Sequence, residues 1–109
     1  MIAEIEQQRQ AVSLLCRQYR VERLDLFGSA ARGIFPSETS DLDFIVRFTG
    51  SHADDYVDRY LDFAAALERL FARRVDLLTE RAIRNPYFRE EVERTRQVVY
   101  EERNQEISA

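Results

Sequence analysis

Hydrophobic positions change their spacing several times along the chain, and each change predicts a different element. Apolar side chains recur at helical intervals over residues 2–19 and again over residues 51–72. Between these segments, β-branched and aromatic residues at 21–27 predict a short strand. Apolar and polar positions alternate over residues 41–48, which is the period of a strand with one buried face. The first two-thirds of the chain therefore reads as helix, strand, loop, strand, helix.

The C-terminal third adds a strand and a helix. Residues 73–79 predict a third strand, in which Asp76 faces away from the apolar residues. Pro86 suits the first turn of a last helix that runs through Val92. Residues 97–100 either extend this helix or form a short edge strand, and the sequence leaves both alternatives open. The order predicts an α/β (α+β) fold, a small mixed sheet flanked by helices.

The predicted helix over 51–72 carries a start signal and an apolar stripe. Ser51 followed by Asp54 resembles a capping box. Apolar residues at spacings of three and four predict the face that packs on the core, namely Val57, Tyr60, Leu61, Ala64, Leu67 and Phe71.

Composition limits the classes of function. A chain of 109 residues, 45% hydrophobic and 33% charged, predicts a single globular domain over residues 1–109. The net charge of −4 argues against direct nucleic-acid binding, which usually needs a basic face. No apolar run is long enough for a membrane span, and the N-terminal segment is too polar for a signal peptide. The single cysteine agrees with a reducing environment, so we expect a cytoplasmic protein.

All sixteen basic residues are arginine. The absence of lysine excludes a Schiff-base lysine, a P-loop lysine and a lysine general base. Any group that holds phosphate must therefore be an arginine, a backbone amide or a metal ion.

A Gly-Ser turn follows the first predicted strand. Gly28 permits a sharp bend, and the small Ser29 lets backbone amides approach a polyphosphate. Arg32 follows at a position from which it can neutralise phosphate charge. By itself such a turn is an ordinary end of a strand.

Three aspartates form the second candidate element. Asp41 and Asp43 are two apart on a strand, so they share a face with Cα atoms about 7 Å apart. If the third strand lies beside the second, Asp76 joins them. Each close pair of carboxylates then repels by about 3 kcal/mol at about 5 Å and an effective dielectric of about 20. A divalent cation removes this difficulty, so we expect a metal site, although singly each aspartate could be a solvated surface residue.

A family resemblance rests on three separated motifs: Gly-Ser-Ala-Ala-Arg-Gly at 28–33, Ser-Asp-Leu-Asp-Phe-Ile-Val at 40–46 and Arg-Val-Asp-Leu-Leu at 74–78. In this order they resemble the minimal nucleotidyltransferases (MNT) of the DNA polymerase β-like superfamily, over roughly residues 21–79. One departure is that eleven residues separate Ser29 from Asp41, one more than is usual, which leaves the shape of that loop open.

The resemblance implies roles for these residues. Gly28 and Ser29 would bind the triphosphate of ATP, with Arg32 beside them. Asp41 and Asp43 would be Mg²⁺ ligands, and Asp76 a third ligand or the base near the acceptor hydroxyl. Small members of the family often act as antitoxins beside a HEPN-domain toxin, and some transfer AMP from ATP to a tyrosine of that toxin.

Two functions of different classes follow. The first is a Mg²⁺-dependent protein adenylyltransferase (AMPylation) that works as an antitoxin in a hetero-oligomer with a HEPN toxin. The second is a non-catalytic antitoxin that inhibits its toxin by binding and occlusion. The three acids favour the enzyme, because a pure binder has no need to hold like charges together. A transferase for a small molecule or a tRNA end is disfavoured by the acidic balance. The sequence leaves open the acceptor, the nucleobase, the number of AMP units and the stoichiometry.

Overall fold

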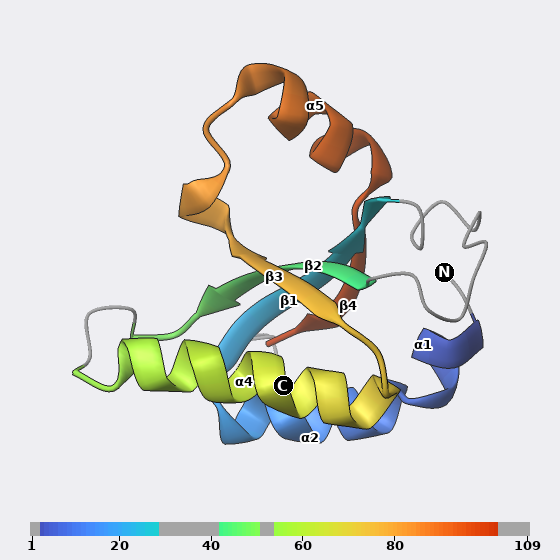
Figure 1. The fold of residues 1–109 in the computed structure, drawn as a ribbon, viewed down its shortest axis with the longest axis vertical. Coiled ribbons are helices and arrows are strands. Elements are labelled where there is room, and N and C mark those ends of the chain that lie inside the picture. Colours follow the sequence, from blue (N-terminus) through green and yellow to red (C-terminus); the bar gives the residue numbers. More distant parts are fainter. Residues whose placement is uncertain (1–2, 29–41, 51–53, 103–109) are drawn as a thin grey trace, which may run out of the picture.

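The computed structural model describes residues 3–28, 42–50 and 54–102. Its elements, labelled as in Figure 1, follow one another along the chain as α1 (Ala3–Gln7), α2 (Arg9–Gln18), β1 (Val21–Phe27), β2 (Leu42–Phe48), α4 (Tyr56–Phe71), β3 (Val75–Thr79), η1 (Glu80–Ala82), α5 (Pro86–Thr95) and β4 (Gln97–Glu101).

The strands form one mixed sheet in the order β3-β2-β1-β4. β1 runs antiparallel to both β2 and β4, whereas β2 and β3 are parallel. Parallel neighbours need a crossover connection, and α4 provides it. Helices α2 and α4 lie side by side against one face, and α5 lies on the opposite side of the sheet (Figure 1). The predicted α+β fold with a small mixed sheet flanked by helices is therefore confirmed.

The main core lies between the sheet and the pair α2 and α4. Its side chains come from the alternate positions that the sequence predicts to face inward on β2, together with those of β1 and the two helices. Fully buried members include Val12, Cys16, Leu24, Leu26, Phe44, Phe63 and Leu67. Burial raises the pKa of the Cys16 thiol to about 12, so this cysteine is a neutral packing group at physiological pH.

A second, smaller core lies on the opposite face of the sheet, beneath α5. It consists of Phe27, Ile45, Ile83 and Val92, with Leu78 packed against them. The alternating pattern of β2 predicts a polar outer face, and this prediction is wrong at Ile45, which is 1% exposed. The reason is that α5 covers part of the face on which Asp43 and Arg47 lie.

The predicted core face of α4 is correct in its C-terminal half and wrong near its start. Leu67 and Phe71 are buried, but Val57 and Leu61 are 64% and 57% exposed. The inward positions near the start of α4 are taken by Arg59 and Phe63 instead. The buried face near the start of α4 therefore lies at a different angle around the helix axis from the apolar stripe that the spacing predicts.

Several boundaries also differ from the predictions. The first predicted helix is divided into α1 and α2 at Gln8, whose N–H donates to the Ile5 carbonyl in a tighter turn. Asp55, not Ser51, is the N-cap of α4, and Ser51 lies outside the described residues. The open question at 97–100 is settled as strand β4.

The last helix begins as predicted. Pro86 occupies the first turn of α5, and the Asn85 side chain accepts hydrogen bonds from the Tyr87 and Phe88 amides at 2.8 and 3.2 Å. Within the described ranges, none of the helices has the length and apolar character needed to cross a bilayer.

Arg59 is a buried cation that connects α4 to the ends of two strands. It is 5% exposed, and its guanidinium donates to the carbonyls of Tyr19 at 3.3 Å, Thr49 at 2.9 Å and Gly50 at 2.9 Å. Its Nε lies 3.5 Å from an Asp55 carboxylate oxygen. These donors satisfy three backbone carbonyls at the point where α2 leads into β1 and β2 ends.

Replacing Arg59 with methionine should lower the free energy of unfolding by about 2–4 kcal/mol, because the three carbonyls lose the donors of a buried charged side chain. The measurement is urea unfolding followed by circular dichroism. Arg69→Met is the matched control, since Arg69 is exposed on the same helix and should change stability by less than about 0.5 kcal/mol. Equal effects of the two substitutions would contradict the structural role given to Arg59.

Candidate active site

The register of the two parallel strands brings two of the predicted acids together. Asp43 of β2 pairs with Asp76 of β3, so the residues are direct neighbours across the strands. Neighbouring strands are about 5 Å apart, and paired residues project from the same face. Asp43 is half-buried and Asp76 is exposed. The structure thus places two carboxylates side by side at one end of the sheet.

Gly28 lies against the first of these acids. The preceding residue, Phe27, is the partner of Asp43 across β1 and β2. Gly28 has φ +78°, and a Cβ built on it would lie 2.9 Å from Asp43 Oδ2. A side chain at this position would therefore be strained in its backbone and would collide with the carboxylate. Both reasons favour glycine at this position, because any other residue would strain the backbone and push the Asp43 carboxylate aside.

The amide of Gly28 is engaged by a residue that sequence reasoning missed. It donates to the Thr95 hydroxyl at 3.3 Å, and that hydroxyl donates to the Glu91 carbonyl at 2.9 Å. Because its N–H is already bonded to Thr95, Gly28 contributes to the site through its backbone conformation and its lack of a side chain. No local pattern around Thr95 points to this contact, because 67 positions separate it from Gly28.

Tyr60 supports the acidic pair from the side of α4. Its hydroxyl donates to the carbonyl of Leu77, the residue that follows Asp76. Burial raises the pKa of Tyr60, and the nearby charge of Asp76 raises it further, so the phenol stays protonated and keeps its donor role. The bond attaches α4 to the strand that carries the second acid.

The other predicted site residues, Ser29, Arg32 and Asp41, lie outside the described residues. Among the residues that are described, no three His, Cys, Asp or Glu side chains gather as a metal-binding group. Asp43 and Asp76 supply two carboxylates, the oxygen donors that Mg²⁺ prefers, and the space beside Asp43 is kept open by the missing side chain of Gly28. The donor set that is described fits a hard divalent cation.

An ion-pair network fixes the strand that leads into Gly28. Asp25 is fully buried, with Arg23 Nε at 3.0 Å and Arg96 Nε at 2.5 Å, and Arg96 also contacts Glu80 at 2.5 Å. Burial works against the charge of Arg96, but the carboxylates of Glu80 and Asp25 raise its pKa. Burial likewise opposes ionisation of Glu80, yet Arg96 lowers the pKa of its carboxyl. These charges hold the end of α5 and η1 to β1.

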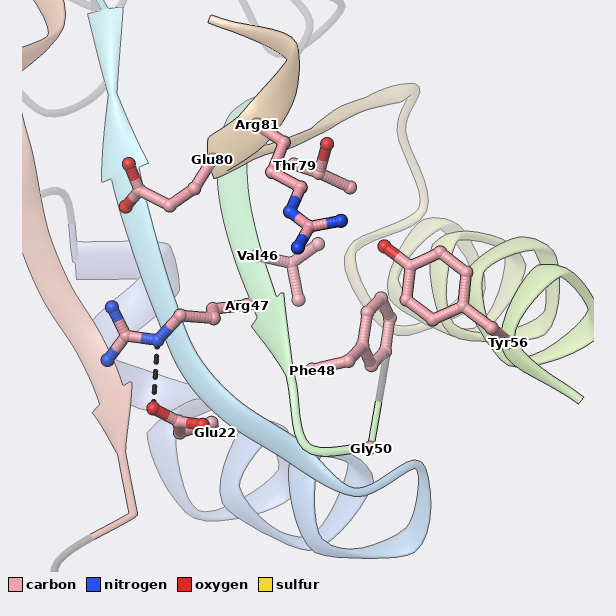
Figure 2. Close-up of a pocket in the computed structure, with 9 residues that line it drawn as sticks. All are labelled: Glu22, Val46, Arg47, Phe48, Gly50, Tyr56, Thr79, Glu80 and Arg81. Atoms are coloured by element: carbon pink, nitrogen blue, oxygen red, sulfur yellow. Dashed lines mark hydrogen bonds and ion pairs between the residues drawn. The ribbon is translucent and has the colours of Figure 1, made fainter. Parts of the chain in front are cut away.

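A separate pocket of about 370 Å³ lies towards the other end of β2 and β3 (Figure 2). The Val46–Thr79 pair in its wall is three positions further along the strands than Asp43–Asp76, or about 10 Å. Arg47 and Glu22 form an ion pair at 2.9 Å in its wall, and the guanidinium of Arg81 lies near Thr79 in Figure 2. This pocket is distinct from the pair of acids.

The architecture has a counterpart among known proteins. The model of the nucleotidyltransferase domain family matches residues 8–99. The chain belongs to this family. The match includes the whole sheet apart from the last residues of β4. The prediction of a nucleotidyltransferase is confirmed at the level of the family.

Relatives at more than 30% identity agree with this assignment. Two proteins of Methanocaldococcus jannaschii, named as candidate protein adenylyltransferases MJ1379 and MJ0128, are 35% and 33% identical to the chain. Each alignment covers 78% of this chain and 83% of the relative. A solved structure of a candidate minimal nucleotidyltransferase is 36% identical, with a TM-score of 0.68, and covers 84% of this chain and 89% of that one.

More distant structures share the fold. A toxin–antitoxin complex with AMP-PNP has a TM-score of 0.65 at 18% identity, covering 92% of this chain and 78% of that chain. A complex of a tri-AMPylated Shewanella oneidensis HEPN toxin with an MNT antitoxin has a TM-score of 0.61 at 15% identity, covering 95% and 78%. These likenesses confirm the nucleotidyltransferase fold.

The close approach of Gly28 to Asp43 can be tested with alanine. Gly28→Ala should weaken binding of Mg²⁺ and ATP at least about tenfold, because the new Cβ displaces the Asp43 carboxylate. Gly50→Ala is the matched control, since Gly50 also has a positive φ of +67° but nothing lies within 4 Å of its Cβ position. Both variants should lose about 1–2 kcal/mol of stability through backbone strain.

Isothermal titration calorimetry and urea unfolding measure the two effects separately. Unchanged nucleotide binding in a folded Gly28→Ala protein would show that this turn is not part of a nucleotide site.

Proposed function

We propose that this protein is a Mg²⁺-dependent protein adenylyltransferase that transfers AMP from ATP to a hydroxyl, a tyrosine of a HEPN-type toxin, and so acts as the antitoxin. The observation that carries the proposal is the pairing of Asp43 with Asp76 beside the bare backbone of Gly28. Two like charges at facing positions destabilise a sheet, so their placement needs a reason other than stability. Membership of the nucleotidyltransferase family supports the proposal that this reason is the binding of a metal ion.

The proposed reaction is a substitution at the α-phosphorus of ATP. The acceptor's hydroxyl oxygen forms a bond to this phosphorus while the bond to the β-phosphate oxygen breaks, so pyrophosphate leaves. The hydroxyl proton passes to a carboxylate, and we assign this role to Asp76 because it is the more exposed of the two paired acids. Catalysis then consists mainly of positioning and charge neutralisation.

Asp43 is proposed as a metal ligand together with Asp41, which leaves the carboxylate of Asp76 to accept the proton. A bound magnesium ion would neutralise phosphate charge and orient the triphosphate. Ser29 and Arg32 are proposed to hold the phosphates in the turn that follows Gly28. Gly28 supports this assignment, because it has no side chain to fill the space beside Asp43 Oδ2.

The proposed partner follows from the relatives. The two archaeal proteins carry names of protein adenylyltransferases, and one structural neighbour is an MNT antitoxin solved with an AMPylated HEPN toxin. A protein acceptor also suits an acidic chain better than a nucleic acid does. We therefore propose a hetero-oligomer of this chain with a HEPN-domain toxin in the cytoplasm.

Nucleotide binding can be tested by thermal unfolding with and without Mg²⁺ and ATP. A ligand at about 100 times its dissociation constant stabilises the native state by about 2.7 kcal/mol. In a domain of this size, the wild-type Tm should then rise by about 10 °C or more. Asp43→Asn should lose this increment, and Asp62→Asn, which changes an exposed acid on α4, should keep it. The same shift in Asp43→Asn and in wild type would refute the proposed site.

Mass spectrometry of the toxin distinguishes inhibition by AMP transfer from inhibition by binding and occlusion. Wild-type protein with ATP and Mg²⁺ should add AMP-sized increments to the HEPN-domain toxin that it binds, and the toxin should stay inactive after the two are separated. The double variant Asp41→Asn with Asp43→Asn should still bind the toxin but add no mass. An unmodified toxin that regains activity on dissociation from wild type would establish occlusion instead.

A further inference from the structure

The Thr95 hydroxyl joins the C-terminal end of α5 to the residue that opens the Gly-Ser turn. It accepts from the Gly28 N–H at 3.3 Å and donates to the Glu91 carbonyl at 2.9 Å. Because its proton is committed to the helix, the oxygen presents its lone pairs to Gly28. Thr95 is 9% exposed, so water has little access to replace this acceptor.

Contacts on both sides hold Thr95 in place. The next residue, Arg96, places its Nε 2.5 Å from the buried Asp25 carboxylate, and Gln97 pairs with Leu26 as β4 begins. Two turns earlier on α5, Phe88 meets Phe27 edge-to-face, with ring centroids 5.9 Å apart. All of these contacts end on β1, so they hold α5 against the strand around the Thr95–Gly28 bond.

The same bond affects Asp43 through the backbone of Gly28. A Cβ at Gly28 would lie 2.9 Å from Asp43 Oδ2, so the backbone runs close beside this carboxylate. A shift of Gly28 towards β2 would crowd the carboxylate, and a shift away would widen the space in which we propose that the phosphates lie. The Thr95 bond opposes both movements because it fixes the direction of the Gly28 N–H.

We propose that Thr95 is a positioning residue for the nucleotide site: its hydroxyl sets the orientation of the Gly28 backbone and thereby the place of Gly28 relative to Asp43. This inference rests on the proposed function, since it presumes that the site takes a nucleoside triphosphate. It makes α5 part of the site's framework, although the helix contributes no group to the phosphates or the metal.

The test compares Thr95→Val, which has the same shape without the hydroxyl, with Thr95→Ser, which keeps the hydroxyl. Thr79→Val is the matched control, because it makes the same chemical change at the far end of the sheet, in the wall of the separate pocket (Figure 2). Calorimetry measures the dissociation constant of each protein for AMP-PNP in the presence of Mg²⁺. Hydrogen exchange of the Gly28 amide is followed by NMR, and Tm reports the fold.

Thr95→Val should weaken AMP-PNP binding about fivefold and speed exchange of the Gly28 amide by a similar factor or more. Thr95→Ser should remain near wild type in both measurements, and Thr79→Val should match wild type. Unchanged binding in a folded Thr95→Val protein would overturn the proposal. Equal loss in Thr95→Ser would also overturn it, because that result would assign the effect to packing of the methyl group.

Two further measurements use the wild-type protein, so the proposal does not depend on the folding of one variant. The Gly28 amide should be protected from exchange, and AMP-PNP should shift the amide resonances of Gly28 and Thr95; absence of either effect would overturn the positioning role. Wild-type protein that binds AMP-PNP but transfers no AMP would refute the proposed function alone. Wild-type protein that binds no nucleotide would refute both.

Discussion

The parallel pairing of β2 with β3 is the constraint on which the arrangement of this protein depends. Parallel neighbours require a long crossover, so α4 must cross one face of the sheet and seal the main core there. The same pairing sets Asp43 directly opposite Asp76, a juxtaposition of like charges that a sheet would otherwise avoid. One topological choice thus creates both the largest hydrophobic core and the candidate chemical centre.

Arginine side chains make most of the side-chain hydrogen bonds and ion pairs that join distant segments in the described part of the chain. Arg59 holds three carbonyls where two strands meet α4, and Arg96 joins Asp25 of β1 to Glu80 of η1. A guanidinium suits such positions because its donors spread in a plane and it stays charged when buried. In a chain without lysine, these contacts fix the directions of elements whose apolar packing alone would leave them free to rotate.

The sequence predicted the first three strands and the helix between the second and the third well, because alternation and short motifs are local signals. Asp43 and Asp76 were placed on the correct faces, and the register then brought them together. Ile45 was missed, because its burial depends on α5, which is distant in sequence. Arg59 and Thr95 were missed for a related reason: each bonds to backbone groups of remote segments, and no spacing rule encodes such contacts.

The two cores differ greatly in size, and this difference divides the molecule into regions of unequal local stability. The core beneath α5 rests on Phe27, Ile45, Ile83 and Val92, whereas the core beneath α2 and α4 contains most of the buried apolar side chains. The free energy of local opening is lowest where few apolar contacts are broken. We therefore expect α5 to open more readily than α2 or α4, while the strands β1, β2 and β3 remain folded. Such an opening would leave Asp43 and Asp76 paired across β2 and β3 but would remove the Thr95 hydrogen bond from the amide of Gly28.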